Sequence, residues 1–274
     1  DTIGTLKFPV GACLIKNFYY PEDFRNPTGK RRIMETRLLV HREKAWEALD
    51  YIWNDEQTEA TLENAGDLKE ISWVHYNGEA RKADYVIPNK NQCKGCHWNN
   101  GENIVPIGPK VRNLNRDYEY ATGKENQLSY WINAGILKNA PAISAMPAIA
   151  DWTDSVHQST ETRARAYLEM NCGHCHNPQG PAYTSGLYLN LDNANMERLG
   201  ACKTPVAAGK ATGNHFFDIV PGKPEESIMI FRMKSEDPGI RMPEVGKNLV
   251  HTEGVALIEK WISEMKPDAC VAGR

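Results

Sequence analysis

Two five-residue stretches carry the residue types in this chain that are best suited to chemistry. They are Cys93–His97, which reads CKGCH, and Cys172–His176, which reads CGHCH. In each stretch two thiols stand three positions apart, and a histidine follows the second thiol directly. This C-x-x-C-H pattern is the attachment signature of c-type haem, because the thiols can form thioether bonds to the porphyrin and the imidazole can then ligate the iron.

The pattern predicts two covalently attached haem c groups. The predicted anchors are Cys93, Cys96, Cys172 and Cys175, and the predicted iron ligands beside them are His97 and His176. The alternatives are a redox dithiol and a zinc site. Zinc would use the four thiols together or would pair them with histidines at other spacings. The motif occurs twice and each copy is followed by a Met-Pro pair, which favours haem.

The Met-Pro pairs predict the second axial ligand of each iron. Met146-Pro147 follows the first motif, and Met242-Pro243 follows the second. A thioether is a soft, neutral ligand that suits haem iron, and proline stiffens the loop behind the sulfur. Most methionines are core residues, so this prediction depends on the repetition of the pair. The alternative distal ligands are Met229, Met233, His157 and His215.

Composition excludes several classes of function. The formal net charge of the 274 residues is -3, and nucleic acid is therefore a poor partner because phosphate binding needs a basic face. No apolar run is long enough to span a membrane. The chain begins without a secretory leader, yet c-type haem is normally attached outside the bacterial cytoplasm. We therefore expect a periplasmic or otherwise exported protein from which a signal peptide has been removed.

Three cysteines remain after the four haem anchors are assigned. They are Cys13, Cys202 and Cys270. In an oxidising compartment two of them can pair, and Cys202 with Cys270 is the pairing we favour because both lie in the expected C-terminal haem module. Three unpaired small apolar residues are an equal alternative, since connectivity does not follow from sequence.

The two haem motifs, read by their likeness to cytochrome c, lead us to expect a mainly α chain. We expect two fused cytochrome c-like haem modules, at residues 85–158 and 159–274, after a mixed, β-containing N-terminal region at residues 1–84. The expected strands are Thr36–Val40 and Ile71–Tyr76, and the expected helices are Arg42–Tyr51, a segment around Leu128–Ile132 that stops at Gly135, Thr160–Asn171 and His251–Lys266.

The helix at Thr160–Asn171 leads directly into the second motif. It also stands where the closing helix of the first module should be. We expect Thr160 to cap it and one helix to serve both modules, because no Gly/Ser-rich or Pro-rich linker separates them.

The segment after the first motif resembles class I cytochromes c, which often carry Gly-Pro-x-Leu there. The matching residues are Gly108 to Leu114, GPKVRNL. The resemblance implies that the Pro109 carbonyl accepts a hydrogen bond from the His97 imidazole, and that Val111 or Leu114 covers the porphyrin. Such an acceptor would set the tautomer of the ligand and raise its basicity.

The whole chain resembles a bacterial family of exported dihaem c-type cytochromes, whose genes often neighbour one for a parallel β-helix protein. The matching stretches are GKRRIMETRLLV at Gly29–Val40, YVIPNKNQCKGCH at Tyr85–His97, RARAYLEMNCGHCH at Arg163–His176 and IVPG at Ile219–Gly222. The resemblance implies haem binding and electron transfer, and it supplies no substrate. Cys13 departs from what the family leads us to expect.

Two functions follow from these predictions. The first is an electron carrier, because two His/Met-ligated haems would be closed to small molecules and would exchange single electrons with donor and acceptor proteins. The second is a dihaem peroxidase, which needs an open iron and an acid/base group near it. The residues available for that role are Glu102, Glu244 and His157. A third reading makes the N-terminal region a docking surface for a partner or a polysaccharide.

Overall fold

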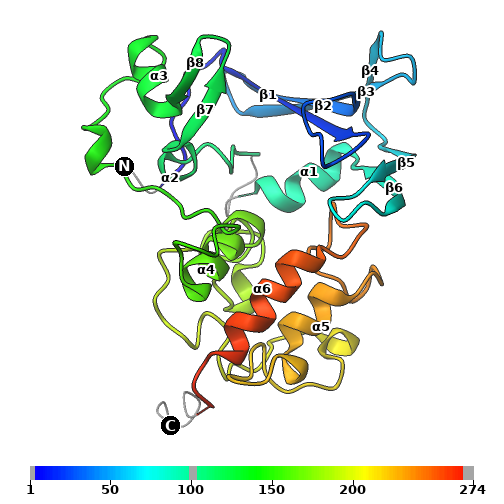
Figure 1. The fold of residues 1–274 in the computed structure, drawn as a ribbon, viewed down its shortest axis with the longest axis vertical. Coiled ribbons are helices and arrows are strands. Elements are labelled where there is room, and N and C mark those ends of the chain that lie inside the picture. Colours follow the sequence, from blue (N-terminus) through cyan, green and yellow to red (C-terminus); the bar gives the residue numbers. More distant parts are fainter. Residues whose placement is uncertain (1–3, 99–103, 268–274) are drawn as a thin grey trace.

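The protein is a mixed α/β chain in which helix and strand each account for about a quarter of the residues. A computed structural model describes residues 4–98 and 104–267 (Figure 1). The prediction of a mainly α fold is therefore wrong. The N-terminal region is more strongly β than the sequence pattern indicated, and after it long loops connect the short helices.

The N-terminal part forms an antiparallel sheet in the order β1-β2-β3-β4. Two smaller antiparallel pairs follow, β5 with β6 and β7 with β8. The strands are β1 (Cys13–Pro21), β2 (Arg31–His41), β3 (Trp46–Trp53), β4 (Ala60–Glu63), β5 (Asp67–Val74), β6 (Ala80–Ile87), β7 (Asp117–Tyr120) and β8 (Gly123–Asn126). The two predicted strands are confirmed, since they fall within β2 and largely within β5.

The predicted helix at Arg42–Tyr51 is wrong, because this segment turns and becomes β3. Ala45, Trp46 and Leu49 fit a helical stripe, but Trp46 pairs with His41 and Leu49 pairs with Leu38 across the ladder with β2. A short apolar run is compatible with either period. Pairing with the long neighbouring strand decides in favour of β structure here.

A β-bulge in β2 buries two consecutive side chains. Phe18 of β1 pairs with Glu35 and Tyr19 pairs with Ile33, so Met34 is the additional residue. Met34 and Glu35 are both fully buried. Strict alternation would turn one of the two outward, whereas a bulge re-aims a side chain locally. The bulge thus explains why a carboxylate points into the protein.

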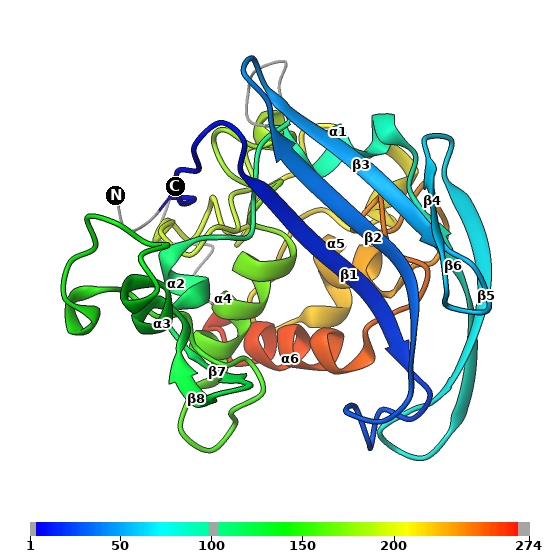
Figure 2. The same cartoon turned by 90° about the horizontal axis from the view of Figure 1, so that it is seen from above.

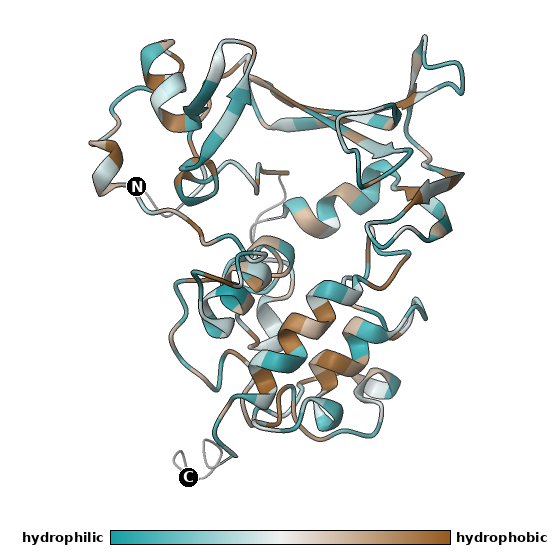
Figure 3. Ribbon diagram, viewed as in Figure 1, coloured by the Kyte–Doolittle hydropathy of each residue, from teal (hydrophilic) through white to brown (hydrophobic). Residues whose placement is uncertain are grey.

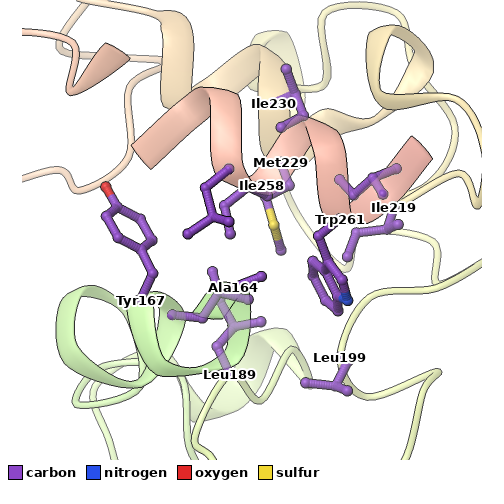
Figure 4. Packing of buried hydrophobic residues seen from close by; sticks show 12 residues of the cluster. Ala164, Tyr167, Leu189, Leu199, Ile219, Met229, Ile230, Ile258 and Trp261 are labelled. Atoms are coloured by element: carbon purple, nitrogen blue, oxygen red, sulfur yellow. The ribbon is translucent and has the colours of Figure 1, made fainter. Parts of the chain in front are cut away.

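The C-terminal part contains the main core (Figure 4). Tyr167 and Leu168 pack against Ile258 and Trp261, and all four are buried. The helices are α1 (Lys90–His97), α2 (Val111–Leu114), α3 (Gln127–Asn133), α4 (Thr160–Asn171), α5 (Ile228–Lys234) and α6 (Thr252–Ser263), with short 3-10 turns η1 (Ile143–Ala145), η2 (Tyr183–Ser185), η3 (Gly209–Thr212) and η4 (Pro224–Glu226). Figure 3 shows the strongest apolar colour on α5 and α6, which face one another.

The predicted helices after residue 120 are confirmed. The helix α4 has the predicted bounds, and α6 lies within the predicted His251–Lys266. Gly135, whose φ is +71°, follows the end of α3 as expected. The predicted cap of α4 is off by one residue, because Ser159 rather than Thr160 accepts the hydrogen bond from the Thr162 amide.

The helix α4 contacts segments that belong to both predicted modules. Its Glu169 is buried and accepts hydrogen bonds from Lys110 Nζ, at 2.6 Å, and from the Leu191 amide, at 2.8 Å. One carboxylate therefore joins the segment after the first motif to the segment after the second. That one helix serves two haem modules stays a prediction.

The helix α1 lies between the four-stranded sheet and the C-terminal helices (Figures 1 and 2). It contacts β3 directly. On its other side, a Cβ added at Gly95 would lie 3.8 Å from Val245 Cγ2. The first C-x-x-C-H motif is thus held between the N-terminal sheet and the loop that carries Met242.

Candidate functional site

The first motif occupies the helix α1. Asn89 caps this helix by accepting from the Gln92 amide, and the Gln92 side chain accepts in return from the Asn89 amide. This reciprocal capping box satisfies amides that would otherwise lack partners. Cys93 and Cys96 are three residues apart in the helix and so project from one face.

His97 is held by a backbone carbonyl. Its Nδ1 lies 2.7 Å from the Val105 carbonyl oxygen, and the Val105 amide donates to the His97 carbonyl at 2.8 Å. A carbonyl only accepts, so Nδ1 carries the proton and Nε2 keeps its lone pair. Burial lowers the pKa of His97, which keeps the ring neutral. Nε2 is therefore the nitrogen available to a metal.

The predicted role of Pro109 is wrong. The acceptor for His97 is Val105, and the Pro109 carbonyl accepts instead from the Leu6 amide at 2.8 Å. The reason is a pairing that sequence spacing does not indicate. Ile104 forms antiparallel bridges with Trp98 and with Trp46 of β3, and this places the next residue beside the imidazole.

The second motif begins where α4 ends. Cys172 is the C-cap residue, and the amides of Cys175 and His176 both bond to its carbonyl, at 3.0 and 2.9 Å. Burial lowers the pKa of His176 to about 4, with Arg232 acting in the same direction. Its Nδ1 is buried and has no hydrogen-bond partner among the described residues. Burial also raises the pKa of the Cys172 thiol to about 12.

The two motifs meet at their second cysteines. The sulfur atoms of Cys96 and Cys175 and a ring nitrogen of His174 lie within 4.8 Å of one another. Cys175 Sγ also lies 3.7 Å from the Gly95 carbonyl oxygen, to which it donates. Contact with the Cys175 thiol, and next with His174, lowers the pKa of Cys96. Just beyond the motifs, Trp98 stacks on Tyr183 with ring centroids 6.1 Å apart.

A cavity of about 440 Å³ adjoins the second motif. Cys172 and Met242 both line it, so the structure brings a predicted anchor and its predicted distal ligand to one space. The opposite wall comes from the N-terminal sheets, through Tyr20, Arg37 and Tyr85. Its volume is within the range of small-molecule and cofactor sites. The N-terminal region is thus a wall of this cavity.

Met146 and Leu114 share a hydrophobic cluster. Met146 is buried beside Val111 and Leu128, and Leu114 packs against the same group. Asn115 Nδ2 donates to the Met146 carbonyl at 2.9 Å, which ties the Met-Pro loop to the end of α2. Leu114, predicted to cover the first haem, and Met146, predicted to be its distal ligand, therefore lie together.

Three of the four rival ligands lie away from the cavity, whereas Met233 shares it with Met242. Met229 is buried in the main core, and Met233 packs against that core while also lining the cavity. His157 is exposed and pairs with Asp154, and His215 contacts the ring of Phe231. Of the acid/base candidates, Glu244 is exposed and 3.8 Å from Arg232, whereas Glu102 lies outside the described residues.

Sequence reasoning missed a buried polar cluster beside the first motif. It consists of Glu35 and Arg37 of β2, Asp50 of β3 and Tyr85 of β6. Arg37 binds Glu35 through two hydrogen bonds, of 2.5 and 2.8 Å, and Tyr85 donates to the same carboxylate at 2.5 Å. Glu35 and Arg37 stand two positions apart in a strand, and this spacing indicates that they share a face. The β-bulge that buries Glu35, however, leaves no recognisable pattern in the sequence.

The described residues offer some of the donor atoms that a haem group at each motif would need. His97 offers Nε2, and the cavity joins Cys172 to Met242. In addition, Arg112 is buried, and its Nε and Nη1 have no partner among the described residues, although Nη2 donates to Asp192 at 2.7 Å. A carboxylate is the partner that such an arginine prefers, and porphyrin propionates are carboxylates.

Cys202 is disulfide-bonded, and Cys13 is an exposed free thiol. The predicted partner of Cys202, Cys270, lies outside the described residues. Across residues 4–98 and 104–267, no helix has the length and apolar character that a membrane span needs. Comparison of the chain with protein-family models, with curated proteins and with solved structures found no match.

Proposed function

We propose that this chain is an exported dihaem c-type cytochrome that transfers electrons. The observation that carries the proposal is the pair of C-x-x-C-H motifs, whose second cysteines Cys96 and Cys175 lie side by side in the fold. When bound, haem iron supplies reversible one-electron transfer. Cys93, Cys96, Cys172 and Cys175 would anchor the two groups.

The chain's own residues would hold each iron from both sides. His97 and His176 would bind through Nε2, and Met146 and Met242 would bind through sulfur. The His97–Val105 hydrogen bond supports the first pair because it fixes the ring orientation and tautomer. The shared cavity of Cys172 and Met242 supports the second pair. Met ligation raises the reduction potential, which suits a carrier between redox proteins in the periplasm.

A peroxidase is a weaker candidate on this geometry. An acid/base residue must reach the reacting atoms. The predicted candidates Glu244 and His157 are both exposed, and neither lines the cavity.

A thiolate metal site is the second candidate, favoured by one observation. Cys96, Cys175 and His174 offer two sulfurs and one nitrogen within 4.8 Å, a donor set that zinc accepts. It would leave Cys93 and Cys172 unused. Haem attachment would instead convert Cys96 and Cys175 to thioethers, so the two assignments exclude one another.

Intact mass and the visible spectrum of the purified protein decide between them. We expect the mass of the chain plus two porphyrins, and a sulfur-to-iron charge-transfer band in the oxidised state. Met242→Ala should abolish that band for one haem and lower its potential, with Met229→Ala, a core methionine, as the control. Colourless protein that contains zinc would overturn the proposal, and so would a spectrum that neither Met146→Ala nor Met242→Ala changes.

A further inference from the structure

The buried polar cluster of Glu35, Arg37, Asp50 and Tyr85 holds more acid than its cation can balance. Arg37 takes both oxygens of Glu35 through Nε and Nη2, at 2.8 and 2.5 Å. Asp50 stands opposite Arg37 in the ladder between β2 and β3, and its Oδ2 lies 3.3 Å from Arg37 Nε. That nitrogen is already committed to Glu35, so one guanidinium serves two carboxyl groups.

Asp50 is 7% exposed, and neither of its oxygens has a hydrogen-bond partner among the described residues. An ionised carboxylate in such a place is costly, whereas a protonated one supplies its own donor. Burial, and next the neighbouring Glu35, raise the pKa of Asp50 to about 8. Burial also opposes ionisation of Glu35, but the hydrogen bonds from Arg37 and Tyr85 hold its pKa below the ordinary value. The proton of the pair therefore belongs to Asp50.

The cluster lies between the two motifs. The charges of Arg37, Asp50 and Glu35 all act on the Cys93 thiol of α1. On its other side, Arg37 and Tyr85 line the cavity that contains Cys172 and Met242. A change of charge at either motif is therefore felt by the cluster, and the coupling between two sites is reciprocal.

Four other titratable groups face Asp50 from the strands and the helix packed around it. Lys16 of β1 has its pKa lowered by burial and by Arg37. Glu63 of β4 stands opposite Asp50 but turns Oε1 to the Asn64 and Ala65 amides, at 2.7 Å each. Burial keeps Tyr85 of β6 protonated by raising its pKa, and burial raises the pKa of Cys93 of α1. Asp50 is the member of this group that changes charge near neutral pH.

We propose that Asp50 is a redox-linked proton site, which binds one proton when an electron reaches the adjacent haem motif and releases it when the electron leaves. The inference rests on the proposed function. The electron comes from an external one-electron donor and the proton comes from water. Reoxidation returns both, so no bond other than the carboxyl O–H forms or breaks.

The test is the reduction potential of the haem-loaded protein, measured by spectroelectrochemistry between pH 6 and 10. In the native protein, one potential should fall as the pH rises through about 8, because ionised Asp50 favours the oxidised state. The slope should not exceed about 59 mV per pH unit, the value for one proton per electron. Asp50→Asn should remove the slope and hold the potential at its low-pH value.

Two further variants sharpen the result. Glu63→Gln, opposite Asp50 but outside the cluster, should behave like the native protein. Glu35→Gln should move the transition to lower pH, because the carboxylate that raises the proton affinity of Asp50 is gone. An infrared difference spectrum of reduction should contain a protonated carboxyl band that Asp50→Asn lacks.

The outcomes separate the two proposals. Coloured protein whose potentials are flat between pH 7 and 9, or an Asp50→Asn variant that keeps the slope, would overturn this inference and leave the cytochrome intact. If Asp50→Asn does not fold, an unmoved transition in Glu35→Gln would overturn the inference. Protein without porphyrin would overturn the proposed function, and the inference with it.

Discussion

The two C-x-x-C-H motifs share a sequence pattern but are held in different ways. The first forms its own capped helix, α1, beneath a sheet, and the Val105 carbonyl fixes His97 at 2.7 Å. The second follows α4 out of the main core, and His176 is buried with an unpartnered Nδ1. The Val105 carbonyl orients the first imidazole, whereas the second is held by burial, with the Leu187 backbone beside it.

Their electrostatic surroundings differ as well. Arg37, Asp50 and Glu35 act on Cys93, a set whose net charge is negative when both carboxyl groups are ionised, whereas Arg232 and Lys203 act on His176. Negative neighbours favour the oxidised state of a metal centre, and positive neighbours favour the reduced state. If the proposed function holds, the same pair of ligands should therefore give two different reduction potentials, with the lower one at the first motif.

Removal of the cysteine anchors of one motif should have the largest effect, because it leaves only the haem of the other motif to be measured. Cys93→Ala with Cys96→Ala, and Cys172→Ala with Cys175→Ala, should each leave one porphyrin in the intact mass. The haem that remains in the first variant should have the higher potential, because it lies beside Arg232 and Lys203. The measurements are mass spectrometry and a redox titration at pH 9, where Asp50 is ionised.

A cysteine pair changed to serine in the same positions is the matched control for packing. Two porphyrins retained in either alanine variant would contradict the motif assignment. A lower potential for the haem at the second motif would contradict the electrostatic ranking alone.

Truncation of a buried leucine should affect the motif that its own hydrophobic cluster supports. Leu168, on α4 just before Cys172, is fully buried, and Leu168→Ala should lower the free energy of unfolding by about 2–5 kcal/mol. Leu128→Ala in the cluster around Met146 should cost a similar amount. The two variants should differ in which haem changes its visible spectrum.

Only Leu168→Ala should disturb the spectrum of the second haem, and only Leu128→Ala that of the first. Urea unfolding combined with the visible spectrum at each denaturant concentration measures both. Identical spectral changes in the two variants would show that the motifs are not separately supported.

The smallest effect should come from the helix caps. Asn89→Ala removes the reciprocal capping of α1, and Ser159→Ala removes the cap of α4; each should cost about 0.5–2 kcal/mol. The first change should loosen the His97 motif, because α1 consists of little besides that motif. The second should spread over a helix anchored by the main core.

Thermal unfolding and amide hydrogen exchange at residues 90–97 would check this. Asn89→Ser, which keeps a capping oxygen, is the control. Faster exchange in α1 for Ser159→Ala than for Asn89→Ala would reverse the expected ranking.

The local sequence pattern was enough to predict an element where interactions between neighbours along the chain decide its structure. The bounds of α4 and the stop at Gly135 follow from apolar spacing and from a residue that tolerates positive φ. It was not enough for residues 42–51, where a helical stripe was overruled by pairing with β2. It also placed the acceptor for His97 at Pro109, whereas a bridge from Trp46 to Ile104 selects Val105.

Residue types and spacing were enough to predict the available ligand chemistry, because two thiols and an imidazole stand within five residues of one another. They were also enough to predict the helix that leads into the second motif. Three contacts emerge only in the folded chain: Cys96 meets Cys175, the N-terminal sheets line a cavity beside Cys172, and Asp50 shares Arg37 with Glu35. Those contacts join residues far apart in the chain, and strand register with one β-bulge sets them, which residue spacing alone does not encode.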